Sequence, residues 1–554
     1  MAKRYRILAI FVILMLGVGL RTYRLGFQSL WNDEVITYQV SSSQPWTIVT
    51  NPPNDVNIPP LYYLITHSVL RLGEQESLLR LVSMIFGSLS ILVFYLVLRN
   101  WIGSNTGLIG ATIMAISPFH IWYSQEARGY ALLLFLSLLS LWLLQELIKR
   151  RKNLLLKISF VISTALTFYC HTVGIAFIGF TLAYILLVIP HQKWKEWLPL
   201  FGAVFLLIAP AIYRFLIIPP VASANTFQSF SPLFAPYTIW AFGTGYSLGP
   251  TLIELHGLDP IRMRVVLSYL PIIFPVMLFF CILLLLGVLQ LRKKDNLLFQ
   301  LTALWFILPL AFAFIGSIIT VHPFNVRYAV LSFPAFLVFV TAGTQFFREK
   351  WAKRFTFAII GIIFIFSLIN YFFDERYHRD DNRAAGRFLS AHASPNDLVI
   401  ASAAYTSDNL RYYYQGMPVK IVGYPQKKNQ LETGARFIEP SRVQTDLKAI
   451  LGERERFWLF LSRTYHSDPH GYIRNYCDVH FNRERELKGS GVDLVLYKKR
   501  VNNNSNSKKR TEGGFEEAAS IRNGTEGHKN SRWYLPEITQ AGLSRHPSTM
   551  VVQR

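Results

Sequence analysis

Long apolar runs recur from the N-terminus to Phe373, and each is followed by a short basic or polar stretch. A run of about 18 to 25 residues, coiled as an α-helix, matches the roughly 30 Å hydrocarbon core of a bilayer. The pattern therefore predicts a polytopic α-helical membrane protein with about eleven transmembrane helices. The expected spans are residues 7–24, 78–98, 105–119, 129–148, 157–170, 173–190, 198–217, 266–290, 298–319, 327–346 and 354–373.

The pattern changes after Phe373 to short apolar runs that alternate with helix-like stretches, which is typical of a small α/β domain. Beyond about Arg500 the chain is rich in Asn, Ser, Lys and Glu and lacks apolar periodicity, so we expect disorder there. The apolar runs are 398–401, 419–422, 457–461 and 492–496, with a helix-like stretch at 442–451. The expected division is a membrane domain at 1–375, an outer α/β domain at 376–500 and a disordered tail at 501–554.

Composition agrees with this division. Of 554 residues, 52% are apolar and only 16% are charged, whereas about a quarter of the residues of a soluble globular protein are charged. A soluble enzyme, a coiled coil and a disordered scaffold are thereby excluded.

Polar sequence follows the first apolar run in place of a small-residue cleavage site, so we expect a retained helix and no signal peptide.

Lys and Arg number 56 against 33 Asp and Glu, which gives a formal net charge of +23. These basic residues crowd into short loops between apolar runs, and this placement indicates a cytoplasmic side that attracts anionic lipid rather than nucleic acid. The odd number of spans then places the C-terminal part outside. Cys170, Cys281 and Cys477 are far apart in sequence, which argues against a disulfide framework and a cysteine-based zinc site.

The first outer loop places two adjacent acids, Asp33 and Glu34, directly after a membrane helix and beside Trp31. One interpretation is structural, with Asn32 or Asp33 capping an amphipathic helix. The other is chemical, since a carboxylate that is partly desolvated at a membrane surface can serve as a general base. The sequence leaves both open.

A second polar cluster, Ser117 to Tyr130, lies between two spans that are otherwise Leu, Ile and Ala. On one continuous helix, Tyr123, Glu126 and Tyr130 would share a face. Ionisable groups at membrane depth are expensive, so the cluster favours a cavity lining. The alternative is a surface belt in which Glu126 pairs with Arg128.

Other polar positions allow two interpretations each. His171, between two apolar stretches, is either a packing residue or a ligand. Arg327, at the outer end of a span, either snorkels to the interface or offers its guanidinium to a phosphate, which we favour.

Two segments also allow two interpretations each. The Asp55-to-Tyr63 segment, with Tyr62, is a loop-to-helix junction or a cavity roof. The loop from Pro219 to Met263, with Tyr246, Glu254, His256 and Asp259, is a lid or a connection.

Taken together, these motifs resemble those of the bacterial glycosyltransferase family 39 proteins, which are relatives of the protein O-mannosyltransferases and the lipid A aminoarabinose transferase in the GT-C superfamily. The resemblance covers about residues 1 to 375, and its most specific part is Ser124-Gln125-Glu126-Ala127-Arg128. One position departs from the family pattern, because Asn57-Ile58 stands where relatives commonly have a histidine. The motifs are Trp31-Asn-Asp-Glu, Pro59-Pro-Leu-Tyr-Tyr, Ser117-Pro-Phe-His-Ile-Trp-Tyr-Ser-Gln-Glu-Ala-Arg, Tyr169-Cys-His-Thr and Asn325-Val-Arg-Tyr.

The resemblance implies an inverting glycosyltransferase of GT-C fold that moves a sugar from a polyprenyl-phosphate carrier to a lipid, protein or glycan acceptor. By this resemblance Asp33, with Glu34 beside it, is the catalytic acid pair, while Arg128 and Arg327 bind the donor phosphate. It also implies a bacterial cytoplasmic (inner) membrane protein with its active site and C-terminal domain on the outer face. The residues expected to line the cavity are Tyr62, His120, Tyr123, Glu126, Tyr130 and His171.

Metal use stays open in this interpretation, because some relatives hold a divalent ion near the first-loop acid and others need none. Glu126, His120 and His171 are candidate ligands, but no spacing compels a metal.

A transporter or flippase is the alternative function. It is less favoured because polar residues cluster at one interface and no internal repeat is visible. A non-catalytic anchor for the α/β domain would leave the polar clusters unexplained. The sugar, the acceptor and the carrier length are not readable from the sequence.

Overall fold

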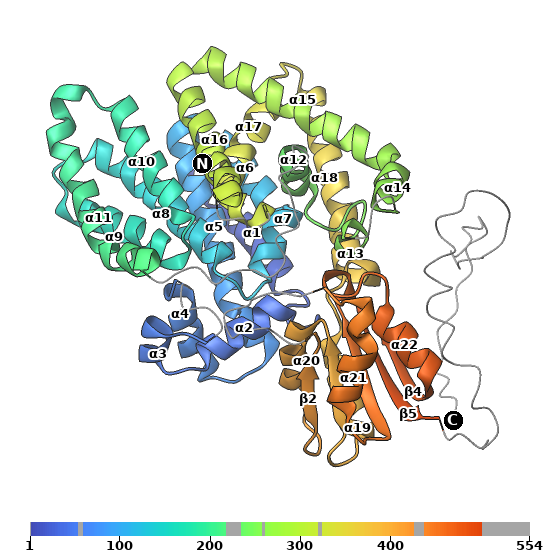
Figure 1. The fold of residues 1–554 in the computed structure, drawn as a ribbon. Helices are drawn as coiled ribbons and strands as arrows, with labels where there is room; N and C mark the ends of the chain where they lie inside the picture. Colours follow the sequence, from blue (N-terminus) through green and yellow to red (C-terminus); the bar gives the residue numbers. More distant parts are fainter. Residues whose placement is uncertain are drawn as a thin grey trace, which may run out of the picture. The chain divides into compact units, whose positions relative to one another are not determined.

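A computed structural model describes residues 2–53, 59–217, 234–256, 261–319, 324–425 and 437–500. Met1 to Lys499 form one compact unit, in which helices precede a C-terminal sheet (Figure 1). The predicted tail at 501–554, Asp55 to Ile58, and Asp259 lie outside the described residues.

The helical part follows the predicted apolar runs. Among the described residues, eight helices are long and apolar enough to span a membrane, and shorter apolar helices occupy three further predicted positions, 105–119, 157–170 and 173–190. A polytopic helical fold is confirmed, while the predicted number of eleven spans remains a prediction. The helices are α1 (Ala2–Thr22), α2 (Asn32–Ser41), α3 (Pro45–Thr50), α4 (Leu61–Leu70), α5 (Glu76–Ile102), α6 (Ser104–Ile116), α7 (Pro118–Ser124), α8 (Tyr130–Lys149), α9 (Leu154–Cys170), α10 (Gly174–Val188), α11 (Trp194–Ile217), α12 (Phe234–Thr244), α13 (Leu252–Leu255), α14 (Ile261–Ser268), α15 (Leu270–Lys294), α16 (Asn296–Ile319), α17 (Phe333–Thr344) and α18 (Lys350–Phe373).

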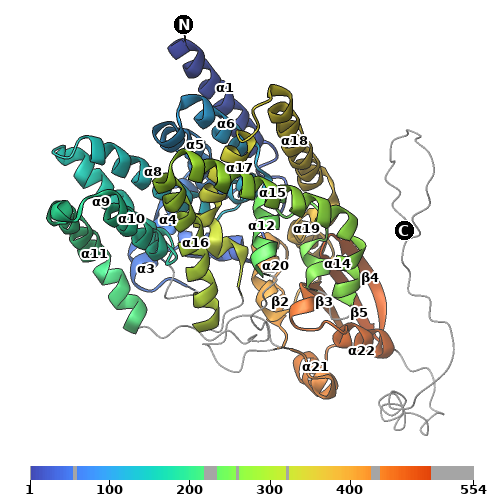
Figure 2. The ribbon, with the colours of Figure 1, turned by 90° about the horizontal axis from the view of Figure 1, so that it is seen from above.

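Two of the predicted outer loops contain helices. The described residues of the first outer loop form α2, α3 and α4, and α12 lies within the Pro219-to-Met263 segment, which the sequence predicts to be a lid or a connection. Short apolar segments with prolines at their starts, such as Pro45 and Pro118, begin helices because proline is tolerated in the first turn. In the view of Figure 2, α15 and α17 lie side by side, in agreement with their extensive packing.

The C-terminal part is an α/β domain with a five-stranded sheet in the order β2-β1-β3-β5-β4. β1 pairs in parallel with β2 and β3, whereas β5 is antiparallel to β3 and β4. The predicted strands are confirmed. The elements are α19 (Asn382–His392), β1 (Leu398–Ser402), α20 (Ser407–Tyr413), β2 (Lys420–Gly423), α21 (Val443–Leu451), β3 (Arg456–Ser462), α22 (Tyr472–His480), β4 (Phe481–Gly489) and β5 (Val492–Lys499).

Alternation along the strands builds a core on each face of this sheet. Leu398 and Ile400 of β1 pack with α21 and α22, whereas Val399 and Ala401 pack with α19 and α20. Successive strand residues point to opposite faces, so a strand covered on both sides is apolar throughout. The domain therefore has helices on both faces of its sheet.

The α/β domain contacts the first loop of the membrane part through hydrogen bonds. Ser29 Oγ donates to the Asp380 backbone oxygen at 2.5 Å, and the Leu30 backbone N–H donates to the Tyr413 hydroxyl at 2.7 Å. Asn382 donates to the Leu30 backbone oxygen at 3.0 Å. These bonds hold the chain that leads into α2, and so they fix the start of the helix that carries Asp33.

Candidate active site

Of the two predicted catalytic acids, Asp33 is the one whose side chain contacts a predicted phosphate-binding arginine. Arg327 Nη1 donates to Asp33 Oδ2 at 2.6 Å, and the two side chains are 22% and 18% exposed, respectively. Arg128 Nη1 lies 3.4 Å from the Asp33 backbone oxygen and 3.3 Å from the Tyr63 hydroxyl. Although Asp33 and Arg327 are 294 positions apart in sequence, the fold brings them and Arg128 to one place.

Local structure explains how these side chains are held. Asp33 and Glu34 lie in the first turn of α2, where the helix dipole favours carboxylates. The N-cap is Trp31 and no side chain caps the helix, so the interpretation of Asn32 or Asp33 as the cap is wrong. Arg327 is the second residue of a 3-10 helix, Val326–Ser332, and its backbone N–H donates to the Asn325 side chain at 3.1 Å.

Charge keeps Asp33 ionised. Burial by itself would raise the pKa of Asp33, but the positive charges of Arg327 and Arg128 outweigh it and hold that pKa at about 2. Arg327 Nε is buried and has no hydrogen-bond partner among the described residues. The guanidinium therefore retains donor capacity that an anionic ligand can use.

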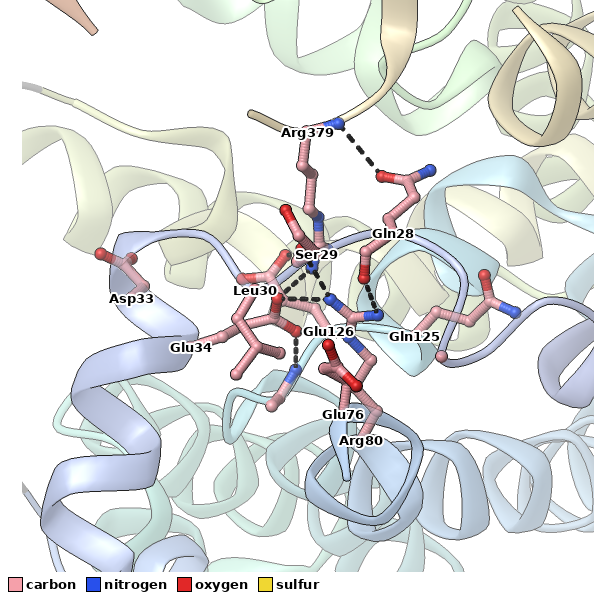
Figure 3. Close-up of polar contacts among 12 residues, drawn as sticks. Gln28, Ser29, Leu30, Asp33, Glu34, Glu76, Arg80, Gln125, Glu126 and Arg379 are labelled. Carbon is pink, nitrogen blue, oxygen red and sulfur yellow. Dashed lines mark hydrogen bonds and ion pairs between the residues drawn. The ribbon is translucent and has the colours of Figure 1, made fainter. Parts of the chain in front are cut away.

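Glu34 points away from Asp33, into a separate buried cluster (Figure 3). Arg80 donates to both of its oxygens at 2.8 and 2.7 Å, and Arg379 Nη1 donates to Oε2 at 2.5 Å. The Ala127 backbone N–H adds a bond of 2.8 Å to Oε1. Burial opposes ionisation, but Arg379 and Arg80 lower the pKa of Glu34 to about 2. This carboxylate thus ties α2 to α5, to the α7–α8 connection and to the segment after α18.

Glu126 approaches the other terminal nitrogen of the Arg379 guanidinium from the one that contacts Glu34. Its Oε2 accepts from Trp122 Nε1 at 3.1 Å and lies 3.7 Å from Arg379 Nη2. Burial raises its pKa to about 7, and the negative charges of Glu34 and Asp33 add to this effect against the pull of Arg379. Glu126 therefore titrates near neutral pH. Its cationic neighbour is Arg379 rather than Arg128, the partner expected in the surface-belt interpretation.

The predicted single helical face for Tyr123, Glu126 and Tyr130 is wrong. α7 ends at Ser124 and α8 begins at Tyr130, so Glu126 lies in the connection between them. The Gln125 side-chain amide donates to the backbone oxygens of Arg21 at 2.9 Å and Tyr23 at 2.8 Å, which fixes this connection against the end of α1.

Three of the predicted cavity residues, Tyr123, Tyr130 and His171, lie together beside the arginines. Tyr130 packs beside His171, with ring centroids 5.5 Å apart, and His171 lies 5.9 Å from the Tyr328 ring. Burial, together with the positive charges of Arg128 and Arg327, lowers the pKa of His171 to about 3, so this ring is neutral beside the arginines. Tyr123 joins this group through its ring contact of 5.3 Å with Tyr130.

Tyr62 and His120 take part in other buried contacts. The Tyr62 hydroxyl is 2.8 Å from Ser83 Oγ, which donates to the Arg128 backbone oxygen at 3.1 Å. His120 Nδ1 lies 2.6 Å from Arg21 Nη2. Both side chains are buried and support the surroundings of the site.

Sequence reasoning missed three arginines that organise the site, namely Arg21, Arg80 and Arg379. Arg21 and Arg80 are fully buried on helices that can span the membrane, and a guanidinium inside an apolar helix is a usable signal for a polar network. Arg379 follows the last membrane helix in ordinary polar sequence. No local pattern marks it, because its partners Glu34 and Glu126 are more than 250 positions away.

The three candidate metal ligands lie apart, with His120 beside Arg21, His171 between Tyr130 and Tyr328, and Glu126 beside Arg379. Across the described parts of the chain, no group of three or more His, Cys, Asp or Glu side chains could hold a metal ion. These donors do not form a metal centre in this arrangement.

Comparisons with known proteins agree with this fold. Residues 57–214 match the model of the dolichyl-phosphate-mannose-protein mannosyltransferase family. No curated protein sequence matches the chain. The fold is similar to that of ArnT from Cupriavidus metallidurans, solved with undecaprenyl phosphate, at a TM-score of 0.52 and 13% identity, covering 90% of this chain and 98% of ArnT.

The archaeal oligosaccharyltransferase AglB from Archaeoglobus fulgidus, solved with an inhibitory peptide and dolichol-phosphate, is similar at a TM-score of 0.51 and 11% identity. That match covers 89% of this chain and 74% of AglB. A structure of the Archaeoglobus fulgidus enzyme with zinc and sulfate gives 0.51 and 13%, covering 89% and 73%. The family match over residues 57–214 and the shared fold confirm the predicted resemblance of this chain to the GT-C glycosyltransferases.

Proposed function

We propose that this protein is a membrane glycosyltransferase that moves a sugar, with inversion, from a polyprenyl-phosphate carrier to an acceptor hydroxyl. The observation that carries the proposal is the Asp33–Arg327 contact of 2.6 Å, with Arg128 beside it. It brings together a carboxylate at the start of α2, a guanidinium from the connection before α8 and a guanidinium from the 3-10 helix before α17. The family match over residues 57–214 supports this choice of chemistry.

The reaction needs a base on one side of the anomeric carbon and a stabilised phosphate on the other. Asp33 accepts the proton of the acceptor hydroxyl while the acceptor oxygen bonds to the anomeric carbon. The bond from that carbon to the phosphate oxygen breaks, and the phosphate leaves on its lipid with the electron pair. Arg327 and Arg128 neutralise the departing phosphate through charge-assisted hydrogen bonds.

The same pairing gives the site a way to respond to the donor. With Arg327 on its carboxylate, Asp33 has a pKa of about 2 and is a weak base. A donor phosphate that engages the Arg327 guanidinium weakens its attraction for Asp33, and the pKa of Asp33 then rises toward a value more useful for proton transfer. The Asp33 carboxylate would thereby become a stronger base when the donor is bound.

We assign the neighbouring residues supporting roles. Glu34 positions α2 and the 125–129 connection, since its two oxygens are already occupied by Arg80, Arg379 and the Ala127 N–H. Tyr130 and neutral His171 shape the wall beside the arginines. The lipid tail lies between helices, so that apolar binding energy positions the reactive headgroup.

We further propose that the site opens on the outer face of a bacterial inner membrane. The basic loops support this orientation, because Lys and Arg concentrate on the opposite side from Asp33. The donor sugar is a hexose or pentose, and the acceptor is a lipid, a protein or a glycan.

The test is Asp33→Asn, compared with the wild type and with the control Asp408→Asn, which alters an exposed helix pair with Arg411. Cells that express each form in place of the native protein are analysed by mass spectrometry of envelope glycans, lipids and proteins. We expect Asp33→Asn to lower one glycosylated product by about 100-fold or more, the size of a lost general base. Asp408→Asn should leave that product unchanged.

Binding of undecaprenyl phosphate to the purified variants serves as the second measurement. Asp33→Asn should retain binding, while Arg327→Gln should weaken it by about tenfold, the loss of one charge-assisted contact. An envelope that is identical in the wild type and in well-folded Asp33→Asn would contradict the proposed function.

A further inference from the structure

The sheet of the α/β domain has a point where its chain connections diverge. β1 and β3 are adjacent and parallel, and they end at Ser402 and Ser462. The chain leaves β1 toward β2 on one side of the sheet, and it leaves β3 toward β4 and β5 on the other side. In open α/β sheets, ligands bind outside the carboxyl ends of the strands at such a switch point.

Chemistry-bearing side chains gather at this edge. The short helix after β1 carries Tyr405, and the turn after β3 carries Arg463, Tyr465 and His466. Tyr405 OH lies 2.6 Å from His466 Nδ1. All four side chains are half-buried, and none belongs to the two apolar cores of the domain. Packing of the sheet therefore does not explain them.

Arg463 adopts a left-handed backbone conformation with φ 52°, which costs an L-residue about 1 to 2 kcal/mol. Its guanidinium is held by Asp380 at 2.7 Å and lies 4.9 Å from the centre of the Trp31 ring. A strained turn that aims a cation at an aromatic ring is a feature that functional sites tend to keep.

The membrane part completes the cluster. The His256 ring lies 4.8 Å from Tyr465 and 5.4 Å from His466. Trp31 Nε1 is buried without a hydrogen-bond partner among the described residues. Since Trp31 precedes Asp33 by two positions, the cluster adjoins the proposed base. We name Trp31, His256, Tyr405, Arg463, Tyr465 and His466 the switch-point cluster.

We infer that the switch-point cluster is an acceptor subsite that binds a pyranose ring of a carbohydrate acceptor, either a glycan or the headgroup of a glycolipid. This inference rests on the proposed function. Aromatic rings offer apolar faces for the C–H face of a sugar, and the guanidinium, imidazole and phenol groups at their edges can hydrogen-bond to its hydroxyls. Because Asp380 already balances the charge of Arg463, the cluster suits a neutral, hydroxyl-rich ring.

The topology disfavours a peptide at this place. An extended peptide commonly binds by adding a strand to an exposed sheet edge. β1 lies between β2 and β3, and β3 lies between β1 and β5, so neither strand that ends here has a free edge. The groups on offer are ring faces and side-chain donors, which match a sugar better than a backbone.

The test measures sugar binding by the full-length protein in lipid nanodiscs with saturation-transfer NMR. The probes are the methyl glycosides of glucose, galactose, mannose and N-acetylglucosamine. We expect the wild type to bind at least one probe, and Tyr465→Leu to lower its affinity by about tenfold, the loss of one ring contact. The control Tyr476→Leu, which removes a ring stacked on His480 in α22, should bind like the wild type.

Tyr405→Phe removes one hydroxyl and keeps the ring, so it reports on the cluster even where Tyr465→Leu fails to fold. We expect it to weaken binding several-fold. Binding of undecaprenyl phosphate at the wild-type level verifies that each variant is folded. The absence of binding for all four probes in the wild type, or equal binding by Tyr405→Phe and the wild type, would overturn the subsite.

Asp33→Asn separates this inference from the proposed function. It should bind the probe sugar normally while its envelope product is lost. Sugar binding that depends on Tyr465, together with an envelope unaffected by Asp33→Asn, would refute the transferase and leave the binding site. If the product that depends on Asp33 is a glycosylated protein, the inference of a carbohydrate acceptor is refuted and the transferase stands. If that product is found in the lipid or the polysaccharide fraction, the fraction identifies the acceptor as a glycolipid or a glycan.

Discussion

The adjacent acids Asp33 and Glu34, at the start of α2, contact two different pairs of arginines. Asp33 faces Arg327 and Arg128, whereas Glu34 faces Arg80 and Arg379 (Figure 3). Neighbouring residues on a helix point in directions about 100° apart, so one step along the chain moves a carboxylate from one cluster to the other. The site pairs one half-buried acid with an arginine that retains donor capacity, and it uses the other acid as an anchor.

Glu126 gives a prediction about pH. Its pKa is 4.5 in an unfolded chain and about 7 in the fold. Between pH 4.5 and pH 7 the folded protein keeps the Glu126 proton that the unfolded chain has released. The stability that this group contributes is therefore complete below pH 4.5 and is lost as the pH rises to 7. Glu126→Gln removes the loss, which amounts to about 3 kcal/mol. We therefore expect the variant to exceed the wild type in Tm at pH 8, and to match it near pH 4.5.

Thermal unfolding of the purified protein at both pH values measures this difference. Glu484→Gln, on an exposed position of β4, is the control and should change Tm equally little at either pH. A difference between Glu126→Gln and the wild type that is the same at pH 4.5 and pH 8 would show that folding does not shift the pKa of Glu126.

At the scale of elements, helix contacts depend on which glycine faces a neighbour. A Cβ on Gly287 of α15 would lie 2.1 Å from the Phe339 backbone oxygen of α17, and one on Gly343 of α17 would lie 2.3 Å from the Leu283 backbone oxygen of α15. Small residues let membrane helices approach closely in this way. A Cβ on Gly361 of α18 would meet open space.

We predict that Gly343→Ala and Gly287→Ala each destabilise the protein by about 2 kcal/mol, because overpacking forces the two backbones apart. Gly361→Ala should stabilise it slightly, since alanine is about 1 kcal/mol better than glycine in a helix interior. Tm values of the three variants in the same detergent provide the measurement. Equal values for Gly343→Ala and Gly361→Ala would refute the close α15–α17 contact.

The strands show where sequence pattern succeeds and where it fails. β1 and β3 were predicted because they are buried on both faces and read as continuous apolar runs. β4, with the sequence FNRERELKG, was not predicted, because it is an edge strand that carries charged side chains. Its existence depends on hydrogen bonds to β5 rather than on its own composition.

At the scale of the whole molecule, the α/β domain and the proposed site belong to the same membrane side in our proposal. The hydrogen bonds from Ser29 and Leu30 to the α/β domain require this, since they join it to the loop that carries Asp33. Arg379 adds a charge contact to Glu34 across the same junction.

This arrangement predicts the labelling of single cysteines by a membrane-impermeant maleimide. The background carries Cys281→Ser, because Cys281 is exposed while Cys170 and Cys477 are buried. Asn482→Cys on exposed β4 should label in right-side-out membrane vesicles, whereas Lys152→Cys in the basic 149–152 loop should label only after the vesicles are opened. The reverse pattern would place the α/β domain in the cytoplasm.

The sequence by itself determined the helical membrane part, the apolar strands β1, β2, β3 and β5 of the α/β domain and the positions of the chemically unusual residues, because apolar periodicity and the cost of polar groups in a bilayer act locally along the chain. Only the tertiary structure decided that Arg327 meets Asp33, that Arg379 joins Glu34 to Glu126, and that Arg463 covers Trp31. These pairs join residues more than 200 positions apart, and electrostatic partners at that separation are chosen by helix packing and domain contacts, which leave no periodic trace in the sequence.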